Sequence, residues 1–209
     1  MGIYCEHFFP WLMEKIGDAP TEVMGRLRKD TLKGVHGEIL DIGFGIGFNM
    51  LYYPSSVKSV TALDPSENMN RRAARFISDS PVPVTFSKAK AEKMPFDNGE
   101  FDAVVSTMTL CTVDDIQATL KEVKRVLKQG GKFYFLEHVA ALNKKHRRLQ
   151  DLLNSVNKAV FCGCNLNRET EKEIVEAGFE FEKIDRFQLT VQGWPDFMTY
   201  MIQGVGVPH

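Results

Sequence analysis

The chain has 209 residues, of which 44% are hydrophobic and 25% charged, and its formal net charge is -1. This length suits one domain with a full core, and the composition is that of a soluble globular protein. A net charge near zero excludes the general attraction on which nucleic-acid binding depends, and no apolar run reaches the roughly 18 residues of a membrane span, so we expect no nucleic-acid partner and no stable membrane span.

The first 36 residues predict a helical segment, with helices over residues 8–16 and 21–32 and Thr21 as the cap of the second. Four aromatic side chains in this segment fit either a lid over a pocket or packing against a sheet: Tyr4, Phe8, Phe9 and Trp11. The apolar cluster has no basic start or small-residue cleavage site, which argues against a signal peptide. We therefore expect a cytoplasmic protein.

The next segment predicts a cofactor loop. An apolar strand over residues 38–42 carries Asp41 at its carboxyl end and leads into three glycines at alternate positions, Gly43, Gly45 and Gly47. Glycines let the main chain turn sharply and approach a ligand closely. Asp41 then lies where ligands of open α/β sheets bind.

The second expected strand, residues 59–63, indicates which ligand this is. It is followed by Asp64, about 20 residues beyond the first glycine, where an acid can accept both hydroxyls of a ribose. Dinucleotide sites use the spacing GxGxxG, whereas here Phe48 stands at the third-glycine position and no Lys or Arg in the loop meets a phosphate. An acid before the loop favours a cationic adenosine derivative, and the spacing counts against a dehydrogenase.

The remaining elements continue the alternation of helix and strand. We expect helices over 47–53, from about 66, over 116–128, over 144–160 and from about 168, and strands over 82–87, 101–106, 132–139, 179–187 and 197–204. Such alternation predicts an α/β fold with a parallel sheet and helices on both faces. The carboxyl ends of its strands converge on one rim.

Five segments, in the expected order, resemble the motifs of class I S-adenosylmethionine-dependent methyltransferases: Leu40–Gly47, Ala62–Ser66, Ala91–Phe96, Phe101–Ser106 and Glu122–Gly131. The resemblance implies a Rossmann-like three-layer sandwich with a seven-stranded, mostly parallel sheet whose last strand is antiparallel. It implies one methyltransferase domain, divided into a lid segment (1–36), a cofactor-binding core (37–139) and a substrate-side part (140–209). The implied cofactor is S-adenosyl-L-methionine.

A narrower resemblance, to the thiol methyltransferases of the methyltransferase-like seven group and their bacterial relatives, is carried by Leu110–Val113, Phe135–Ala140 and Gly163–Thr170. It implies a small-molecule acceptor, such as a thiol, and a monomer or homodimer. The chain departs from the usual pattern at Phe44 and Ile46, where Cys and Thr are common, and at Lys90, where an acid is common.

The resemblance also implies the cofactor contacts. We expect Asp41, Gly43, Phe44, Gly45 and Gly47 around the methionine end, Asp64 at the ribose, Pro65 and Met69 against adenine, Ala91 and Glu92 at the adenine edge, and Ser106 and Thr107 near the sulfur.

Three residues are candidates for catalysis. His138, at the end of a strand, is placed to take the proton of a thiol, and Glu137 beside it points to the opposite face if the strand alternates there. A structural histidine hydrogen-bonded at the strand end is the alternative. Cys111 has two interpretations. In the functional one it lies between cofactor and acceptor, and in the structural one it is a small buried residue of the turn.

The four cysteines show no regular framework, which predicts reduced thiols. Cys162 and Cys164 lack the further ligands of a zinc site, so no metal is expected. The basic run over 144–148 is typical of a solvated helical face, with an anionic surface or acidic substrate as the alternative.

Two classes of function stay open. One is an enzyme that methylates a thiol, a lipid amine or a quinone-type carbon. The other is a module that binds S-adenosylmethionine or S-adenosylhomocysteine without turnover.

Overall fold

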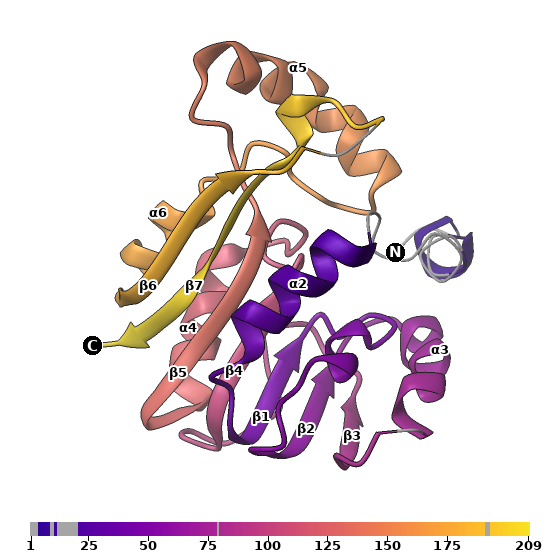
Figure 1. Ribbon diagram of the computed structural model, residues 1–209, viewed down its shortest axis with the longest axis vertical. Coiled ribbons are helices and arrows are strands. Elements are labelled where there is room, and N and C mark those ends of the chain that lie inside the picture. The colour runs from indigo at the N-terminus through magenta and orange to yellow at the C-terminus, as the bar shows by residue number, and fades with distance from the viewer. Residues whose placement is uncertain (1–3, 9–10, 12–20, 79, 191–192) are drawn as a thin grey trace.

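The protein is described by a computed structural model over residues 4–8, 11, 21–78, 80–190 and 193–209. Seven strands form one sheet in the order β3-β2-β1-β4-β5-β7-β6 (Figure 1). They are β1 (Gly37–Ile42), β2 (Val57–Leu63), β3 (Val84–Ser87), β4 (Phe101–Thr107), β5 (Leu127–His138), β6 (Phe179–Gln188) and β7 (Tyr200–Pro208). The first five strands pair in parallel, and β7 runs antiparallel to both of its neighbours. The expected sheet is confirmed.

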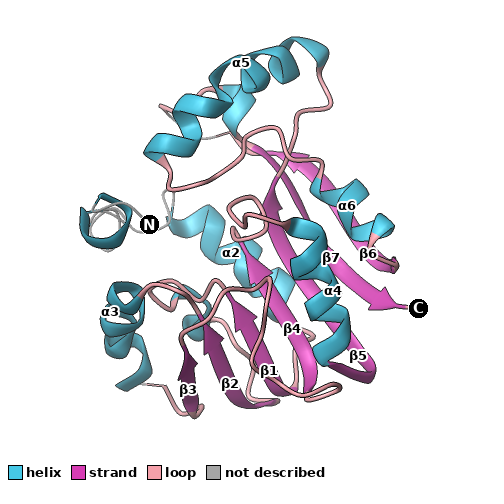
Figure 2. Cartoon of the chain, turned by 180° about the vertical axis from the view of Figure 1, so that it is seen from behind, coloured by secondary structure: helices cyan, strands magenta, loops and turns pink. Residues whose placement is uncertain are grey.

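The helices lie on both faces of this sheet and around its carboxyl rim. They are η1 (Tyr4–Phe8), α2 (Thr21–Leu32), η2 (Phe48–Leu51), α3 (Glu67–Ser78), α4 (Ile116–Val126), α5 (Lys144–Val160), α6 (Thr170–Glu176) and η3 (Asp196–Met198). Helix α2 lies across one face in Figure 1, and α4 and α6 lie on the opposite face in Figure 2. Helix α5 lies beyond the carboxyl ends of the parallel strands in both views. Among the described residues, no helix is long and apolar enough to cross a membrane.

Burial on both faces explains why the strands are almost continuously apolar. Leu40, Val104 and Phe133 belong to the core on the α4 side, while Ile39 and Val105 belong to the core on the α2 side. Because successive side chains of a strand point to opposite faces, alternate residues of each strand belong to one core and the residues between them to the other.

Several expected boundaries were wrong, and three of them show why. The helix expected over 47–53 is the short 3-10 helix η2, because Gly47 has a φ of 89° and Pro54 follows soon after. Helix α4 ends at Val126 rather than at 128, since Leu127 is extended and pairs with Phe101. The strand expected from 197 begins at Tyr200, after η3.

The first expected helix can be compared only in part. The described residues 4–8 form a turn of π-helix, while most of the range 8–16 lies outside the described residues.

Candidate functional site

A cavity of about 830 Å³ opens at the carboxyl rim of the parallel strands. Its wall comes from the glycine loop, the end of β2, the loop after β4, the end of β5, the loop after α5 and the amino-terminal segment. Segments far apart in the sequence therefore meet at the place predicted for ligand binding in an open α/β sheet.

Strand alternation sorts the predicted residues around this cavity. Thr107 and His138 point to the α2 side and line the cavity, whereas Ser106 and Glu137 point to the α4 side and lie behind it. The expected contact of Ser106 with the cofactor is therefore not supported, because its hydroxyl donates to Glu137 Oε1 at 2.6 Å.

The glycine loop has the geometry that its sequence predicts. Gly43 has a φ of 66°, and a Cβ added there would lie 2.1 Å from Thr109 Oγ1. Only glycine fits this combination of a left-handed backbone and a close approach. Gly45 has a φ of 60° and lines the cavity, where an added Cβ would approach nothing closer than 3.8 Å. Gly47 lies behind the wall, against the ring of Phe44.

Asp64 joins the glycine loop to the end of β2. Its carboxylate accepts hydrogen bonds from the amides of Gly45 at 2.9 Å and Ser66 at 2.8 Å. The side chain lines the cavity although Asp64 is 7% exposed. Burial raises its pKa, and the two amide donors oppose that rise. The acid is thus fixed in place, with its charge facing the cavity.

Asp41 lies one layer behind the wall. It accepts hydrogen bonds at Oδ2 from Asn49 Nδ2 at 2.9 Å and Tyr53 OH at 2.7 Å, and Oδ1 is buried with no hydrogen-bond partner among the described residues. Burial raises the pKa of Asp41 to about 6, against the lowering effect of these donors and of Arg28. An acid so placed favours a cationic group nearby.

Arg28 and Asn49 connect Asp41 to the cavity wall and were not found by sequence reasoning. The Arg28 guanidinium donates to Asn49 and, at 2.7 Å, to Thr107 Oγ1, and both Arg28 and Thr107 line the cavity. A signal was available, because Arg28 lies between the buried residues Met24 and Leu32 at helical spacing. A charged residue on the apolar stripe of a helix needs a partner in the interior.

Glu137 holds the loop that follows β4. It is fully buried and accepts from the Ser106 hydroxyl and, at 3.1 Å, from the Thr109 amide, and burial raises its pKa to about 6 despite these donors. In this loop Met108 has a φ of 57°, which is rare for a non-glycine residue. Glu137 therefore shapes the wall from behind, rather than facing the cavity as a catalytic group would.

His138, Cys111 and Cys164 meet on the wall. His138 is 4% exposed, and its ring interacts with Cys164, while neither ring nitrogen meets the geometry of a hydrogen bond with any described residue. Interaction with Cys111 and, to a smaller extent, with His138 lowers the pKa of Cys164 to about 5. Interaction with Cys164 and burial raise the pKa of Cys111. Sequence reasoning gave Cys164 no role at this wall.

The residues expected around adenine all line the cavity: Pro65, Met69, Ala91 and Glu92. Phe44, which was expected at the methionine end, lines it too. The carboxylate of Glu92 accepts the amide of Asp114 at 2.8 Å, so it also fixes the loop before α4. Lys90 forms an exposed ion pair with Asp114 at 2.7 Å.

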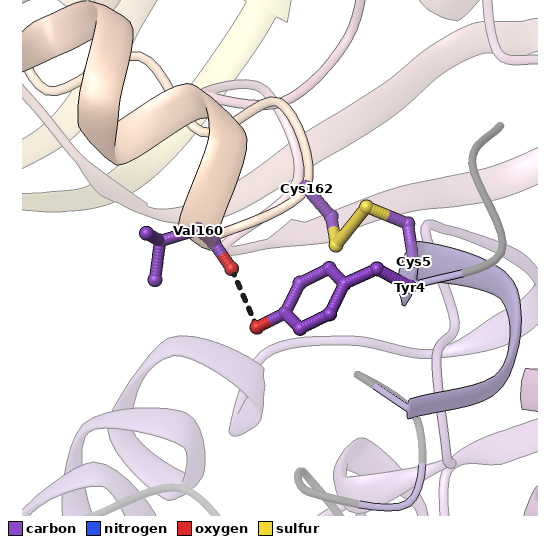
Figure 3. Close-up of a disulfide and its surroundings, with 4 residues drawn as sticks. All are labelled: Tyr4, Cys5, Val160 and Cys162. Atoms are coloured by element: carbon purple, nitrogen blue, oxygen red, sulfur yellow. Dashed lines mark hydrogen bonds between the residues drawn. A yellow bond between two sulfur atoms is a disulfide. The ribbon is translucent and has the colours of Figure 1, made fainter.

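The prediction of four reduced thiols was wrong, because Cys5 and Cys162 form a disulfide (Figure 3). The Tyr4 hydroxyl donates to the Val160 carbonyl at 3.0 Å beside it. Cys5, Glu6 and Cys162 all line the cavity. Tyr4, Phe8 and Trp11 are between 38% and 47% exposed, and Phe9 lies outside the described residues. In the described part of the chain, no group of three or more His, Cys, Asp and Glu is arranged to hold a metal ion.

Comparison with known proteins identifies this arrangement. The model of the family described as "Methyltransferase domain" matches residues 40–135. The human thiol S-methyltransferase TMT1A is 32% identical over 197 residues, which cover 88% of this chain and 80% of the human protein. The chain belongs to the class I S-adenosylmethionine-dependent methyltransferases.

Other comparisons agree with this assignment. The rat thiol S-methyltransferase TMT1B is 33% identical over 189 residues, covering 84% of this chain and 76% of the rat protein. The crystal structure of YcgJ from Bacillus subtilis has the same fold, with a TM-score of 0.68 at 18% identity over 88% of this chain and 97% of that one. This methyltransferase is thus an enzyme whose cofactor is S-adenosyl-L-methionine.

The site fits that cofactor in two respects. The open space at Gly45 leaves the main chain accessible to a ligand, since a side chain there would project into the cavity. Oδ1 of Asp41 has no hydrogen-bond partner among the described residues, and the carboxylate of Asp64 is fixed at the wall, so the cavity has two nearby acids that suit a cationic ligand.

Proposed function

We propose that this methyltransferase transfers the methyl group of S-adenosylmethionine to a small-molecule thiol. The observation that carries the proposal is His138, a buried imidazole on the cavity wall with both ring nitrogens unpartnered among the described residues. A thiol has an ordinary pKa of about 8.5 and reacts as the thiolate, so a nearby imidazole that accepts its proton would assist the reaction. The similarity to two thiol S-methyltransferases supports this acceptor class.

The proposed cofactor contacts follow the positions of the wall residues. Asp64 would accept the ribose hydroxyls, Pro65 and Met69 would pack against adenine, and Ala91 and Glu92 would meet its edge. Arg28 and Thr107 would face the carboxylate of the methionine part, and Asp41 would attract its amino group from the second layer.

When bound, the sulfonium supplies an already activated methyl group, so the work of the protein is alignment and exclusion of water. His138 would hold the proton of the acceptor at a ring nitrogen. Glu137 would position the loop of Met108 and Thr109, which forms the wall between the ends of β4 and β5. One part of the wall is apolar, with Leu189, Trp194, Met198 and Met201 among its members, and would face the acceptor. A water-poor wall favours the approach of an anionic thiolate to a cation.

Transfer of labelled methyl groups to a panel of acceptors tests the proposal. We expect small apolar thiols to accept the label, and amines and quinones of similar size to accept much less. His138→Ala should lower thiol turnover by about 100-fold or more while cofactor affinity stays within about twofold. His146→Ala is the matched control, because His146 is on α5 and bonds to Tyr200 OH at 2.9 Å. Equal turnover of His138→Ala and the parent, or labelling of only amines or quinones, would refute the proposal.

A further inference from the structure

Two of the four cysteines are free thiols on the wall of the cavity. Cys111 belongs to the loop after β4 and Cys164 to the loop after α5. The two loops are tied together, because the main-chain amide and the side-chain amide of Asn165 donate to the Cys111 carbonyl at 2.8 and 3.0 Å. The residue after Cys164 is thus anchored on the backbone of Cys111, which holds the two thiols close enough to interact.

We propose that Cys111 and Cys164 are a peroxide-sensitive pair, in which a hydroperoxide oxidises Cys164 and Cys111 then closes a disulfide with it. Both thiols line a cavity of about 830 Å³, which is large enough to admit a small oxidant. The disulfide between Cys5 and Cys162 leaves only these two thiols free in the chain.

The surroundings make Cys164 the attacking thiol. The Cys111 thiol and the His138 imidazole favour its thiolate, and the pKa of Cys164 falls to about 5. Cys111 stays protonated, since interaction with Cys164 and burial raise its pKa. The imidazole of His138 lies beside Cys164 on the cavity wall, where it can donate a proton to the leaving oxygen.

The chemistry balances in two steps. The Cys164 thiolate attacks one oxygen of the hydroperoxide ROOH, which forms an S–O bond and breaks the O–O bond, and the leaving alkoxide takes up a proton as ROH. The Cys111 sulfur then attacks the sulfenic sulfur of Cys164, the S–O bond breaks, and hydroxide leaves with the Cys111 proton as water. Two thiols are oxidised to a disulfide and one peroxide is reduced.

The cross-link changes the site itself. It joins the loop of residues 108–113 to the loop of residues 161–166, and it removes a thiolate beside His138. We expect methyl transfer to fall by about tenfold or more in the oxidised protein and to return on reduction. The cross-link is independent of the acceptor, whereas its effect on turnover rests on the proposed function.

Peptide mapping of the full-length protein tests the pair directly. Trypsin places Cys5 in residues 1–15, Cys111 in residues 94–121, and Cys162 with Cys164 in residues 159–168. Before oxidation, the third peptide should be linked to the first alone. After hydrogen peroxide treatment, it should be linked to both others, with the loss of two hydrogen atoms from the protein.

Single variants identify the order of the steps. In Cys111→Ser, Cys164 should stop at the sulfenic acid and react with a dimedone-type probe. In Cys164→Ser, Cys111 should remain alkylatable at the same peroxide concentration. The proposal is overturned if Cys111 reacts equally in both proteins, if the new link joins Cys164 to Cys5, or if both thiols survive the treatment. A mapped cross-link with no thiol turnover in the reduced enzyme would retain the pair and reject only the proposed function.

Discussion

Asp41→Asn is the substitution whose effect can be derived most directly from the structure. Asp41 is fully buried, and its Oδ2 accepts from Asn49 and Tyr53 while its Oδ1 has no partner among the described residues. An asparagine keeps the shape and leaves a carbonyl oxygen for both donors. It removes only the charge and the proton that the carboxylate can take up.

The sign and size of the effect follow from the pKa. Burial raises the pKa of Asp41 from 3.8 to about 6, so between these values the folded protein holds a proton that the unfolded chain has lost. The free energy of unfolding then falls as the pH rises through this window. Each unit of pKa difference corresponds to about 1.4 kcal/mol, so the free energy of unfolding should fall by about 3 kcal/mol in total. The fall should be complete above about pH 7.

Urea unfolding of both proteins from about pH 4 to about pH 7.5 measures this loss. Glu137, whose pKa is also raised to about 6, contributes in the same direction to both proteins and cancels in the difference. We expect the stability of the parent, relative to Asp41→Asn, to decrease by about 3 kcal/mol across the range. Asp30→Asn, on the exposed side of α2, is the control and should show no such change. Parallel profiles for the parent and Asp41→Asn would refute the reasoning.

Three further predictions concern the cofactor site. Asp64→Ala should weaken binding of S-adenosylhomocysteine by about 1.5 to 3 kcal/mol, the value of charged hydrogen bonds, and calorimetry showing less than about a twofold change would contradict this. Gly43→Ala should lower the free energy of unfolding by about 2 kcal/mol or more, because the added Cβ meets Thr109. Gly45→Ala should lower it less but still block cofactor binding. Equal denaturation midpoints for the two variants would argue against the close approach at Gly43. In the double variant Cys5→Ser, Cys162→Ser, the free energy of unfolding should fall by about 2 to 4 kcal/mol. If the amino-terminal segment acts as a lid, this variant should also bind the cofactor about threefold or more weakly. Unchanged cofactor affinity, both in this variant and after deletion of residues 1–16, would reject the lid.

The fold was predictable because its signals are local. Apolar runs that end in acids or glycines predicted β1 and β2, and residue spacing gave α2 and α5 with the bounds seen in the structure. Errors arose where pairing with a distant strand decided the boundary, as at Leu127, which continues β5 because it pairs with Phe101.

The site was predictable only in part, because its second layer is assembled from separate elements. Strand alternation implied that Glu137 and His138 point to opposite faces, and the structure adds that Thr107 shares a face with His138 and Ser106 with Glu137. The disulfide joins residues 157 positions apart, and no local pattern signals such a pair.

Asp41 also shows how the cost of a buried acid connects stability to binding. In the unliganded protein its charge is desolvated, which raises its pKa to about 6 and lowers stability at neutral pH. A cationic ligand beside the carboxylate would favour the charged form, so binding near pH 6 should release protons. Calorimetry in buffers of different ionisation enthalpy measures that release. Asp41→Asn should therefore change the two properties in opposite directions, with a smaller loss of stability toward neutral pH and weaker cofactor binding. A variant that loses proton release but binds the cofactor as tightly as the parent would place the ligand's charge away from Asp41.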